Sequence, residues 1–262
     1  MEASVQAQVT RLALNAAPAS APDFLAVEEP LEIRVRGHAV AVTMRTPGHD
    51  EELAAGFLLT EGILRDRSEI IEIAHCRAEG SLAGNVLNIF VAPNVTLDLE
   101  SLTRHVFSAS SCGVCGKASI ESIHQRFPPI QKPLEIPLPV LLTLPEKLRG
   151  AQKTFETTGG LHAAGLFTSA GELLAAREDI GRHNAVDKVI GRSFLAGELP
   201  LMGHILFVSG RASFEIMQKA LAAGIPAVAA VSAPSSLAVD FAKESGQALY
   251  GFVREKGANR YA

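Results

Sequence analysis

Two cysteines that stand two residues apart form the most reactive pattern in the chain. Cys112 and Cys115 lie in the segment Ser110–Lys117, each is followed by a glycine, and apolar residues at helical spacing come directly after. A thiol at the start of a helix lies near the positive end of the peptide dipoles, which stabilises the thiolate and lowers the thiol pKa. The glycines allow close approach of a partner, and Lys117 adds positive charge. The pattern predicts a nucleophilic sulfur.

Three other roles for this pair stay open. A structural zinc site needs four ligands, but Cys76 stands alone and His105 and His124 lack the usual spacing. A thioredoxin-like redox pair would follow a strand of a βαβ unit, which residues 103–107 resemble only weakly. The two thiols could also be buried in an ordinary loop, although the flanking glycines argue against this.

The composition indicates a globular protein with a substantial core. The chain has 262 residues, of which 47% are hydrophobic and 20% charged, and this fits one large domain or two smaller ones. A net charge of -4 gives no general reason to expect nucleic acid or a membrane as a partner, so any anion site must be local. There is no signal-peptide pattern or membrane-spanning apolar run. Because the cysteine usage suits a reducing compartment, we expect a cytoplasmic protein.

The start of the chain predicts an arm followed by a β-rich portion. Residues 1–23 are rich in Ala, Ser, Gln and Pro, and we expect a loose, flexible arm there. Polar and apolar residues then alternate over 31–36 and 39–44, with a turn at Gly37–His38, which predicts a β-hairpin. We expect this hairpin to open an antiparallel β-rich portion, residues 24–127, that carries the cysteine loop.

A helix and two more strands complete this portion. Three acids open a helix that runs from Asp50 to about Gly62, and strands are expected over 68–76 and 85–91. The acids and the adjacent His49 could bind a metal, but acids in a first helical turn have an ordinary explanation in the helix dipole.

The second half predicts an α/β portion. Residues 128–145 are rich in proline, and we expect an irregular connection there. From residue 146 to 262 strands and helices alternate, which implies parallel strands with right-handed crossovers. The expected strands are 162–167, 205–208, 227–231 and 249–253, and the expected helices include 184–194 and one that carries Phe214 to Leu221.

Polar residues follow the expected strands, where open α/β sheets bind their ligands. Ser209–Gly210–Arg211 and Ser232–Pro234 fall at such points, and Arg211 could hold two phosphate oxygens at once. This predicts a nucleotide or phosphorylated cofactor. The glycine spacing matches neither the Walker nor the dinucleotide motif, so a plain strand-to-helix turn stays open.

Two further polar stretches could line a pocket, residues 178–184 and 157–162. His183 could transfer a proton, but a loop histidine is more often solvated or a partner of a helix cap. Its role stays open on the residues alone.

Five motifs occur together and in order: Thr46–Leu58, Ser111–Gly116, Gly159–His162, Arg177–Lys188 and Ser209–Arg211. Together they resemble the FdhD family, sulfur carrier proteins or sulfurtransferases that are needed for active formate dehydrogenase. The resemblance runs from about residue 24 to the C-terminus, and several motifs in one order are more specific than any single motif.

The resemblance implies a cytidine-deaminase-like α/β fold with a three-layer core and a mixed sheet. It implies that the protein receives persulfide sulfur from a cysteine desulfurase and passes it to molybdenum in Mo-bis(molybdopterin guanine dinucleotide). Cys112 would carry the persulfide and Cys115 would be the second thiol. Formate dehydrogenase is the other expected partner, a homodimer is expected, and no permanent metal is required.

The resemblance also implies where the cofactor binds. The family's cofactor-binding segment maps onto Phe252, Val253, Arg254, Glu255, Lys256 and Gly257. Arg254 and Lys256 have the charge to bind phosphate, and Gly257 permits close approach. We add His183 and Arg211 to the expected cofactor-binding residues.

Two alternatives belong to other classes of protein. A zinc-dependent deaminase would need a His/Cys-x-Glu segment ahead of the paired cysteines, and none is evident. A non-catalytic chaperone would hold the molybdenum cofactor for insertion and use the thiols only to clasp it.

Overall fold

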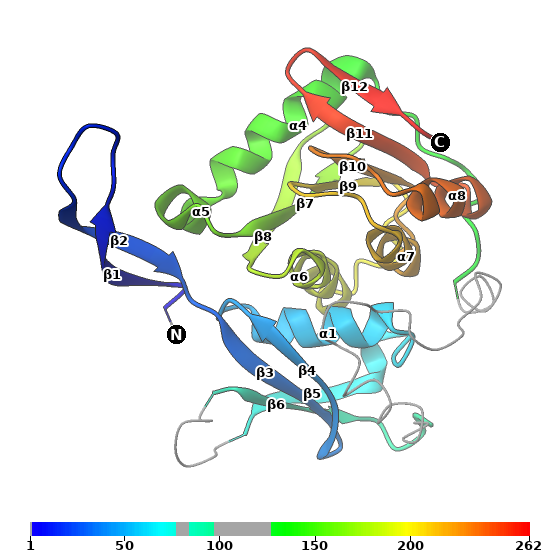
Figure 1. Cartoon of the computed structure of the whole chain (residues 1–262). Coiled ribbons are helices and arrows are strands. Elements are labelled where there is room, and N and C mark those ends of the chain that lie inside the picture. Colours follow the sequence, from blue (N-terminus) through cyan, green and yellow to red (C-terminus); the bar gives the residue numbers. More distant parts are fainter. Residues whose placement is uncertain (1, 77–83, 97–126) are drawn as a thin grey trace.

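The computed structural model describes residues 2–76, 84–96 and 127–262 (Figure 1). Within these ranges the strands form three sheets, of two, four and six strands. Cys112 and Cys115 lie outside the described residues. No helix of the described ranges combines the length and the apolar character that crossing a bilayer requires.

The six-stranded sheet is mixed, with the strand order β12-β11-β10-β9-β7-β8. Strands β9, β10 and β11 are parallel, as predicted, while β7, β8 and β12 pair antiparallel with their neighbours. The strands are β7 (His162–Thr168), β8 (Leu173–Asp179), β9 (His204–Val208), β10 (Ala227–Ala230), β11 (Ala248–Arg254) and β12 (Gly257–Arg260).

Helices cover both faces of this sheet, which gives the predicted three layers (Figure 1). One face packs on α4 (Leu138–Ala151), with the short α5 (Lys153–Thr158) beside it, and the other packs on α6 (Arg182–Leu195), α7 (Phe214–Ala222) and α8 (Ser236–Ser245). Side chains alternate along each strand, so Phe207 joins the hydrophobic cluster on the α4 side and Leu206 the cluster on the opposite side. Because both faces are buried, the strands read as continuous apolar runs.

The N-terminal sheet has the order β4-β3-β6-β5 and packs on α1 (Asp50–Thr60), which lies between this sheet and α6 (Figure 1). The predicted hairpin is β3 (Glu29–Val35) with β4 (His38–Arg45). The other predicted pair is β5 (Ile70–His75) with β6 (Val86–Val91), preceded by the 3-10 helix η1 (Arg67–Glu69). The central pair, β3 with β6, is parallel, so only the outer pairs are antiparallel.

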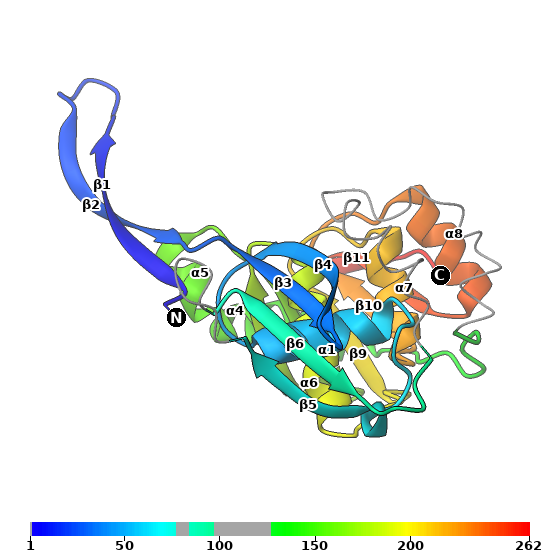
Figure 2. The ribbon, with the colours of Figure 1, turned by 90° about the horizontal axis from the view of Figure 1, so that it is seen from below.

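The N-terminal arm has regular structure, which the prediction of a loose arm did not include. β1 (Ser4–Arg11) and β2 (Ala19–Ala26) form an antiparallel hairpin that projects from the body (Figures 1 and 2). The many alanines and serines hid a weak alternation, in which Val5, Ala7 and Val9 share one face because side chains alternate along a strand. Composition alone therefore missed two strands.

The expected irregular connection over residues 128–145 is partly wrong, because residues 138–145 belong to helix α4. Pro139 stands in the first turn, where a backbone N–H has no partner inside the helix and proline is tolerated. Pro145 lies within the helix, but Leu141, Leu144 and Leu148 bury one side of it against the sheet. Tertiary packing outweighs the proline here.

Candidate cofactor-binding edge of the six-stranded sheet

Several polar residues meet at the edge of the sheet where β9, β10 and β11 end. Ser209 follows β9, and its Oγ accepts a hydrogen bond from the backbone N–H of Ala163 in β7 at 2.9 Å. Gly210 comes next, and a Cβ placed on it would lie 3.4 Å from Nδ1 of His162. Because β7 runs antiparallel to β9, the start of β7 brings His162 to this edge.

The loops after β9 and β10 are joined to each other and to β11. The Ser232 N–H donates to the Gly210 carbonyl at 3.4 Å, and the Phe252 N–H donates to the Ser232 carbonyl at 3.2 Å. Phe252 has a φ of 51°, which is rare for an aromatic residue and is a conformation that clusters at functional sites. The exposed Arg211 and the exposed Phe252 thus lie along one connected edge.

Helices α6 and α7 begin near this edge without a side-chain cap. Gly181 precedes α6, and Ser213 precedes α7 without bonding the first-turn amides. The hydroxyl of Ser213 instead contacts Nε2 of His183 at 3.2 Å. Ser235, by contrast, caps α8 by accepting from the Ala238 N–H at 3.2 Å. The uncapped starts present the positive end of the helix dipole and favour an anion.

Two histidines and an arginine add side-chain chemistry. Nε2 of His183 lies 2.7 Å from Oε2 of Glu215. Burial lowers the pKa of His162, and electrostatic interactions with Arg182 and His183 lower it further, against a smaller opposing effect of Asp179. His162 is therefore a neutral donor and acceptor at pH 7. The buried Nε of Arg182 has no hydrogen-bond partner in the described part of the chain.

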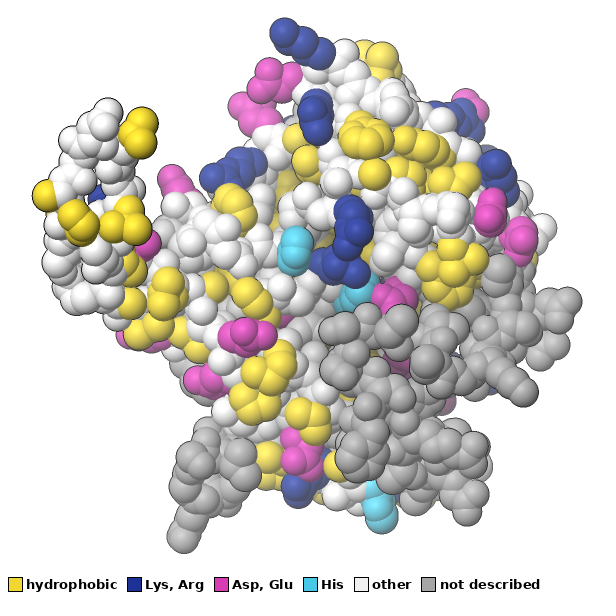
Figure 3. Space-filling model, in the orientation of Figure 1, with side chains coloured by type: hydrophobic (Ala, Val, Ile, Leu, Met, Phe, Trp, Pro, Cys, Tyr) yellow, Lys and Arg dark blue, Asp and Glu magenta, His cyan; other side chains and the backbone are white. Residues whose placement is uncertain are grey.

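A cavity of about 520 Å³ opens beside the same edge. His162, Ser209 and Val231 line it from the strand side, and Arg149, Gln152 and Phe155 line it from the helix side. The guanidinium of Arg149 lies 4.3 Å from the centre of the Phe155 ring. Figure 3 shows histidine and basic side chains gathered at the centre of the face beside α6 and α7. The edge thus has the charge for phosphate, and the adjoining cavity has room for the group attached to it.

The expected cofactor-binding segment at the C-terminus forms the hairpin of β11 and β12. Val253 is fully buried in the hydrophobic cluster under α4, so no part of it is exposed to a ligand. Arg254, Glu255 and Lys256 are exposed at the turn, and Gly257 begins β12. Phe252 is the member of this segment that the loop hydrogen bonds tie to the edge.

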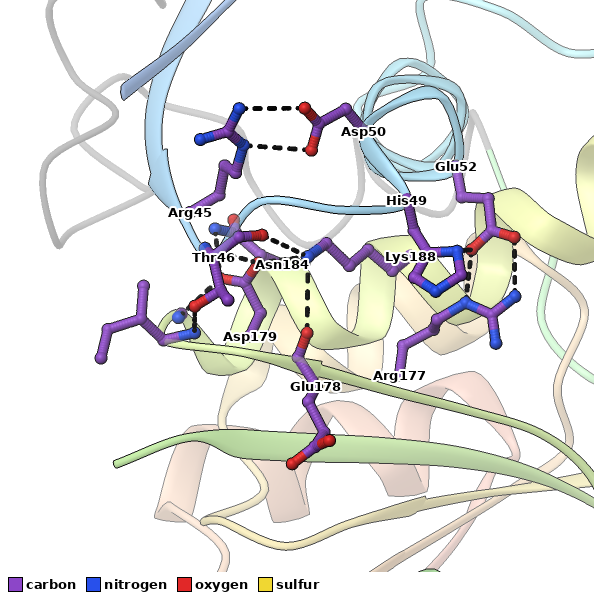
Figure 4. Close-up of polar contacts among 12 residues, drawn as sticks. Arg45, Thr46, His49, Asp50, Glu52, Arg177, Glu178, Asp179, Asn184 and Lys188 are labelled. Atoms are coloured by element: carbon purple, nitrogen blue, oxygen red, sulfur yellow. Dashed lines mark hydrogen bonds and ion pairs between the residues drawn. The ribbon is translucent and has the colours of Figure 1, made fainter. Parts of the chain in front are cut away.

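The acidic part of the stretch 178–184 holds the two portions of the protein together (Figure 4). Asp179 pairs with the buried Nζ of Lys188 at 2.7 Å and accepts from the Thr46 N–H at 3.2 Å. Nζ of Lys188 also donates to the Thr46 carbonyl at 2.9 Å. Asn184 donates to the Met44 carbonyl at 2.8 Å, so α6 is fixed just after Arg182 and His183. Glu178 accepts from the N–H groups of Thr154 and Phe155 and caps α5.

The acids beside His49 also have structural partners. Asp50 forms two hydrogen bonds with Arg45, at 3.0 and 2.9 Å, and Glu52 pairs with Arg177 at 2.5 Å and with His49 at 3.4 Å (Figure 4). Burial alone would raise the pKa of Glu52, but hydrogen bonds from Arg177 and His49 outweigh it and hold the pKa at about 2. Within the described ranges no three His, Cys, Asp or Glu residues are grouped to hold a metal.

The structure thus brings His183, Arg211 and Phe252 to one edge, and it adds His162, Arg182 and Glu215, which we had not singled out. His162 and Arg182 did lie in the two polar stretches noted in the sequence. Glu215 gave no signal, because an acid in the first turn of a helix is ordinary.

Comparisons with known proteins agree with the fold and identify the family. The sequence model of the FdhD/NarQ family matches residues 26–262. A protein of Streptomyces avermitilis named "Sulfur carrier protein FdhD" is 51% identical over 258 residues, which cover 95% of this chain and 90% of the relative. A protein of the same name from Mycobacterium tuberculosis is 54% identical over 248 residues, covering 92% and 90%.

A solved structure shows the same fold. The crystal structure of a candidate formate dehydrogenase accessory protein from Desulfotalea psychrophila superimposes with a TM-score of 0.78 at 23% identity, and it covers 99% of this chain and 97% of that one. The match of the family model over nearly the whole chain, together with relatives above half identity, leads to one conclusion. The chain belongs to the FdhD/NarQ family.

Proposed function

We propose that this protein is a sulfurtransferase that carries sulfur from a cysteine desulfurase to the molybdenum cofactor needed by formate dehydrogenase. Membership of a family whose curated relatives are named sulfur carrier proteins supports the carrier role. The observation that carries the cofactor part is the edge where Arg182, Arg211 and His183 lie beside two uncapped helix starts. Such an edge suits the phosphates of a nucleotide.

Sulfur acceptance is a nucleophilic displacement. The Cys112 thiolate attacks the terminal sulfur of the desulfurase persulfide, and the desulfurase cysteine leaves as a thiolate. Cys112 then carries the persulfide. No metal on this protein takes part in the displacement.

Sulfur release as sulfide needs two electrons. Attack of the Cys115 thiolate on the Cys112 sulfur supplies them: a Cys112–Cys115 disulfide forms, and the terminal sulfur leaves as sulfide for the molybdenum of the bound substrate. A thiol reductant must then reduce the disulfide before the next cycle.

The substrate, Mo-bis(molybdopterin guanine dinucleotide), binds in this proposal through the phosphates of its guanine nucleotide ends. Arg182 and Arg211 hold phosphate oxygens, and His183, oriented by Glu215, donates a hydrogen bond. The cavity bounded by Phe155 and Arg149 receives the attached group. The turn Arg254–Gly257 adds positive charge farther along the C-terminal hairpin.

Mass spectrometry after incubation with a cysteine desulfurase and cysteine tests the proposal. We expect one added sulfur atom on the peptide that contains Cys112, none in the Cys112→Ala variant, and retained but unreleased sulfur in Cys115→Ala. Bound zinc with no added sulfur would instead support the deaminase class. Cofactor binding with neither zinc nor sulfur would support the chaperone.

A further inference from the structure

Gln152 is a buried glutamine whose side-chain amide has no hydrogen-bond partner in the described part of the chain. The residue lies between α4 and α5 and is 6% exposed, and its backbone N–H donates to the Arg149 carbonyl at 3.1 Å. Gln247 shows the ordinary arrangement. It is 2% exposed, and its amide accepts from the Ser245 hydroxyl and donates to the Ile225 carbonyl, both at 2.9 Å. A buried amide without a partner costs free energy, so Gln152 lacks a partner that a ligand can supply.

Gln152 lines the cavity of about 520 Å³ beside the sheet edge. Many of the other lining side chains are apolar, among them Phe155 and Phe207. His162 also lines the cavity, and its imidazole has no hydrogen-bond partner among the described residues. No acid is among the described lining residues, and the guanidinium of Arg149 lies over the Phe155 ring. Apolar walls with a few neutral polar groups suit the ring of a ligand better than its phosphates.

The amide of a glutamine is matched to one kind of ring edge. Its carbonyl oxygen accepts hydrogen bonds and its NH₂ group donates them, so it pairs with an edge that presents a donor and an acceptor side by side. The amino-oxopyrimidine ring of guanine has such an edge, the lactam, whose N–H donates and whose C=O accepts. Pterin contains the same ring with the same lactam. The two hydrogen bonds together would satisfy the buried amide and fix the orientation of the ring.

We propose that Gln152 recognises the lactam edge of the amino-oxopyrimidine ring that guanine and pterin share, through two hydrogen bonds inside this cavity. The inference rests on the proposed function, because the substrate proposed there contains both rings. Ser209 and His162 belong to the cavity wall and also to the sheet edge, so the ring and the phosphates would occupy adjoining places. Gln152 is thus a specificity-determining residue, and the positive sheet edge supplies the binding of phosphate.

Isothermal titration calorimetry of the full chain with GDP and, separately, with neopterin tests the recognition. Gln152→Met keeps the length of the side chain and removes the amide, and we expect it to weaken binding about tenfold or more because the lactam loses both hydrogen bonds. A loss with GDP assigns the cavity to guanine, a loss confined to neopterin assigns it to pterin, and either result supports the proposal. Inorganic pyrophosphate has no ring and should bind the wild type and the variant equally.

Methylation of the probe separates hydrogen bonding from the shape of the cavity. A probe whose ring carbonyl oxygen is methylated has no lactam N–H, and it should bind the wild type about tenfold more weakly than the unmodified probe does. In Gln152→Met the same methylation should have little further effect, because the amide that reads the edge is already gone. Equal losses on methylation in the two proteins would overturn the proposal.

Stability separates a binding role of Gln152 from a structural one. Gln152→Met should unfold at the same urea concentration as the wild type or at a higher one, because no described hydrogen bond of its amide is lost. Gln247→Met is the matched control: it removes a buried amide with two partners and should unfold at a lower concentration. A clear loss of stability in Gln152→Met would overturn the proposal.

The inference and the proposed function fail in different experiments. A wild type that binds neither GDP nor neopterin, or a Gln152→Met variant that binds both as the wild type does, overturns the recognition of the ring. Neither result changes the mass of the peptide that contains Cys112. Absence of added sulfur on that peptide refutes sulfur transfer, whatever Gln152 binds.

Discussion

Gly56 of α1 and Gly191 of α6 face each other so closely that neither has room for a side chain. A Cβ on Gly191 would lie 1.8 Å from the Glu52 carbonyl oxygen and 2.7 Å from the Gly56 nitrogen, and a Cβ on Gly56 would lie 1.9 Å from the Asp187 carbonyl oxygen. The two helix backbones are therefore in direct contact. This contact joins the N-terminal sheet to the α/β portion, and α6 also carries Arg182 and His183 at its start.

Gly191→Ala should destabilise the protein strongly. The added methyl group meets backbone atoms that cannot rotate away, so α1 and α6 must separate, and we expect a loss of about 3 kcal/mol or more in the free energy of unfolding. Urea denaturation measures it. Gly150→Ala is the control, because that glycine lies in α4 with open space around it, and alanine there should be neutral or stabilising by about 0.5 to 1 kcal/mol. Equal stability of Gly191→Ala and the wild type would refute the close packing.

Removing one partner of the Asp179–Lys188 ion pair should destabilise the protein strongly. Both side chains are buried, with 0% and 1% exposure, so Asp179→Asn leaves the Lys188 charge without its carboxylate and should lower the free energy of unfolding by about 3 to 5 kcal/mol. Chemical denaturation provides the measurement. Glu198→Gln removes one partner of the exposed Arg192–Glu198 pair and should change stability by less than about 1 kcal/mol. Similar losses in the two variants would contradict the structural role of Asp179.

Much of the α/β portion was predictable, because buried parallel strands read as continuous apolar runs and glycines such as Gly224 and Gly246 end the helices. The arm and the first half of α4 were not predictable. The alternation of polar and apolar residues in β1 is weak, and the prolines before and within α4 suggested an irregular segment. Packing against the distant six-stranded sheet decided the structure of α4, and pairing of β1 with β2 decided the structure of the arm.

The candidate site was predictable only in part. Arg211 and His183 were found because they follow a strand or precede a helix. The pairing of His183 with Glu215 depends on how α6 and α7 are placed around the sheet, and no local pattern records that placement. The sequence suggested that Glu178 and Asp179 line a pocket. In the structure they accept hydrogen bonds from the backbone N–H groups of Phe155 and Thr46, and such long-range contacts are not visible in the sequence.

Glu52 should make stability depend on pH in the acidic range. Its pKa is about 2 in the folded protein against 4.5 ordinarily, so its contribution is fully present above pH of about 4.5 and is lost as pH falls toward 2. The difference in unfolding free energy between the wild type and Glu52→Gln should therefore be largest at pH 6 and should narrow steadily toward pH 3. Denaturant titrations at each pH measure it, and Glu51→Gln, at an exposed neighbouring position, controls for the loss of a first-turn charge. A gap that stays constant with pH would rule out the Glu52–Arg177 pair as its source.

Arg211 and Arg182 should control nucleotide binding without controlling stability. Arg211 is exposed and the Nε of Arg182 lacks a partner in the described residues, so neither side chain holds the fold through a described ion pair. If phosphate binds at the sheet edge, Arg211→Ala and Arg182→Ala should each weaken GDP binding about tenfold, because a hydrogen bond to a charged group contributes about 1.5 to 3 kcal/mol. Isothermal titration calorimetry measures the affinity, and Lys243→Ala, an exposed lysine on α8, serves as the charge control. Parallel titration of Arg254→Ala and Lys256→Ala then locates the site: a loss confined to these two variants would move the phosphates from the strand ends to the turn of the C-terminal hairpin.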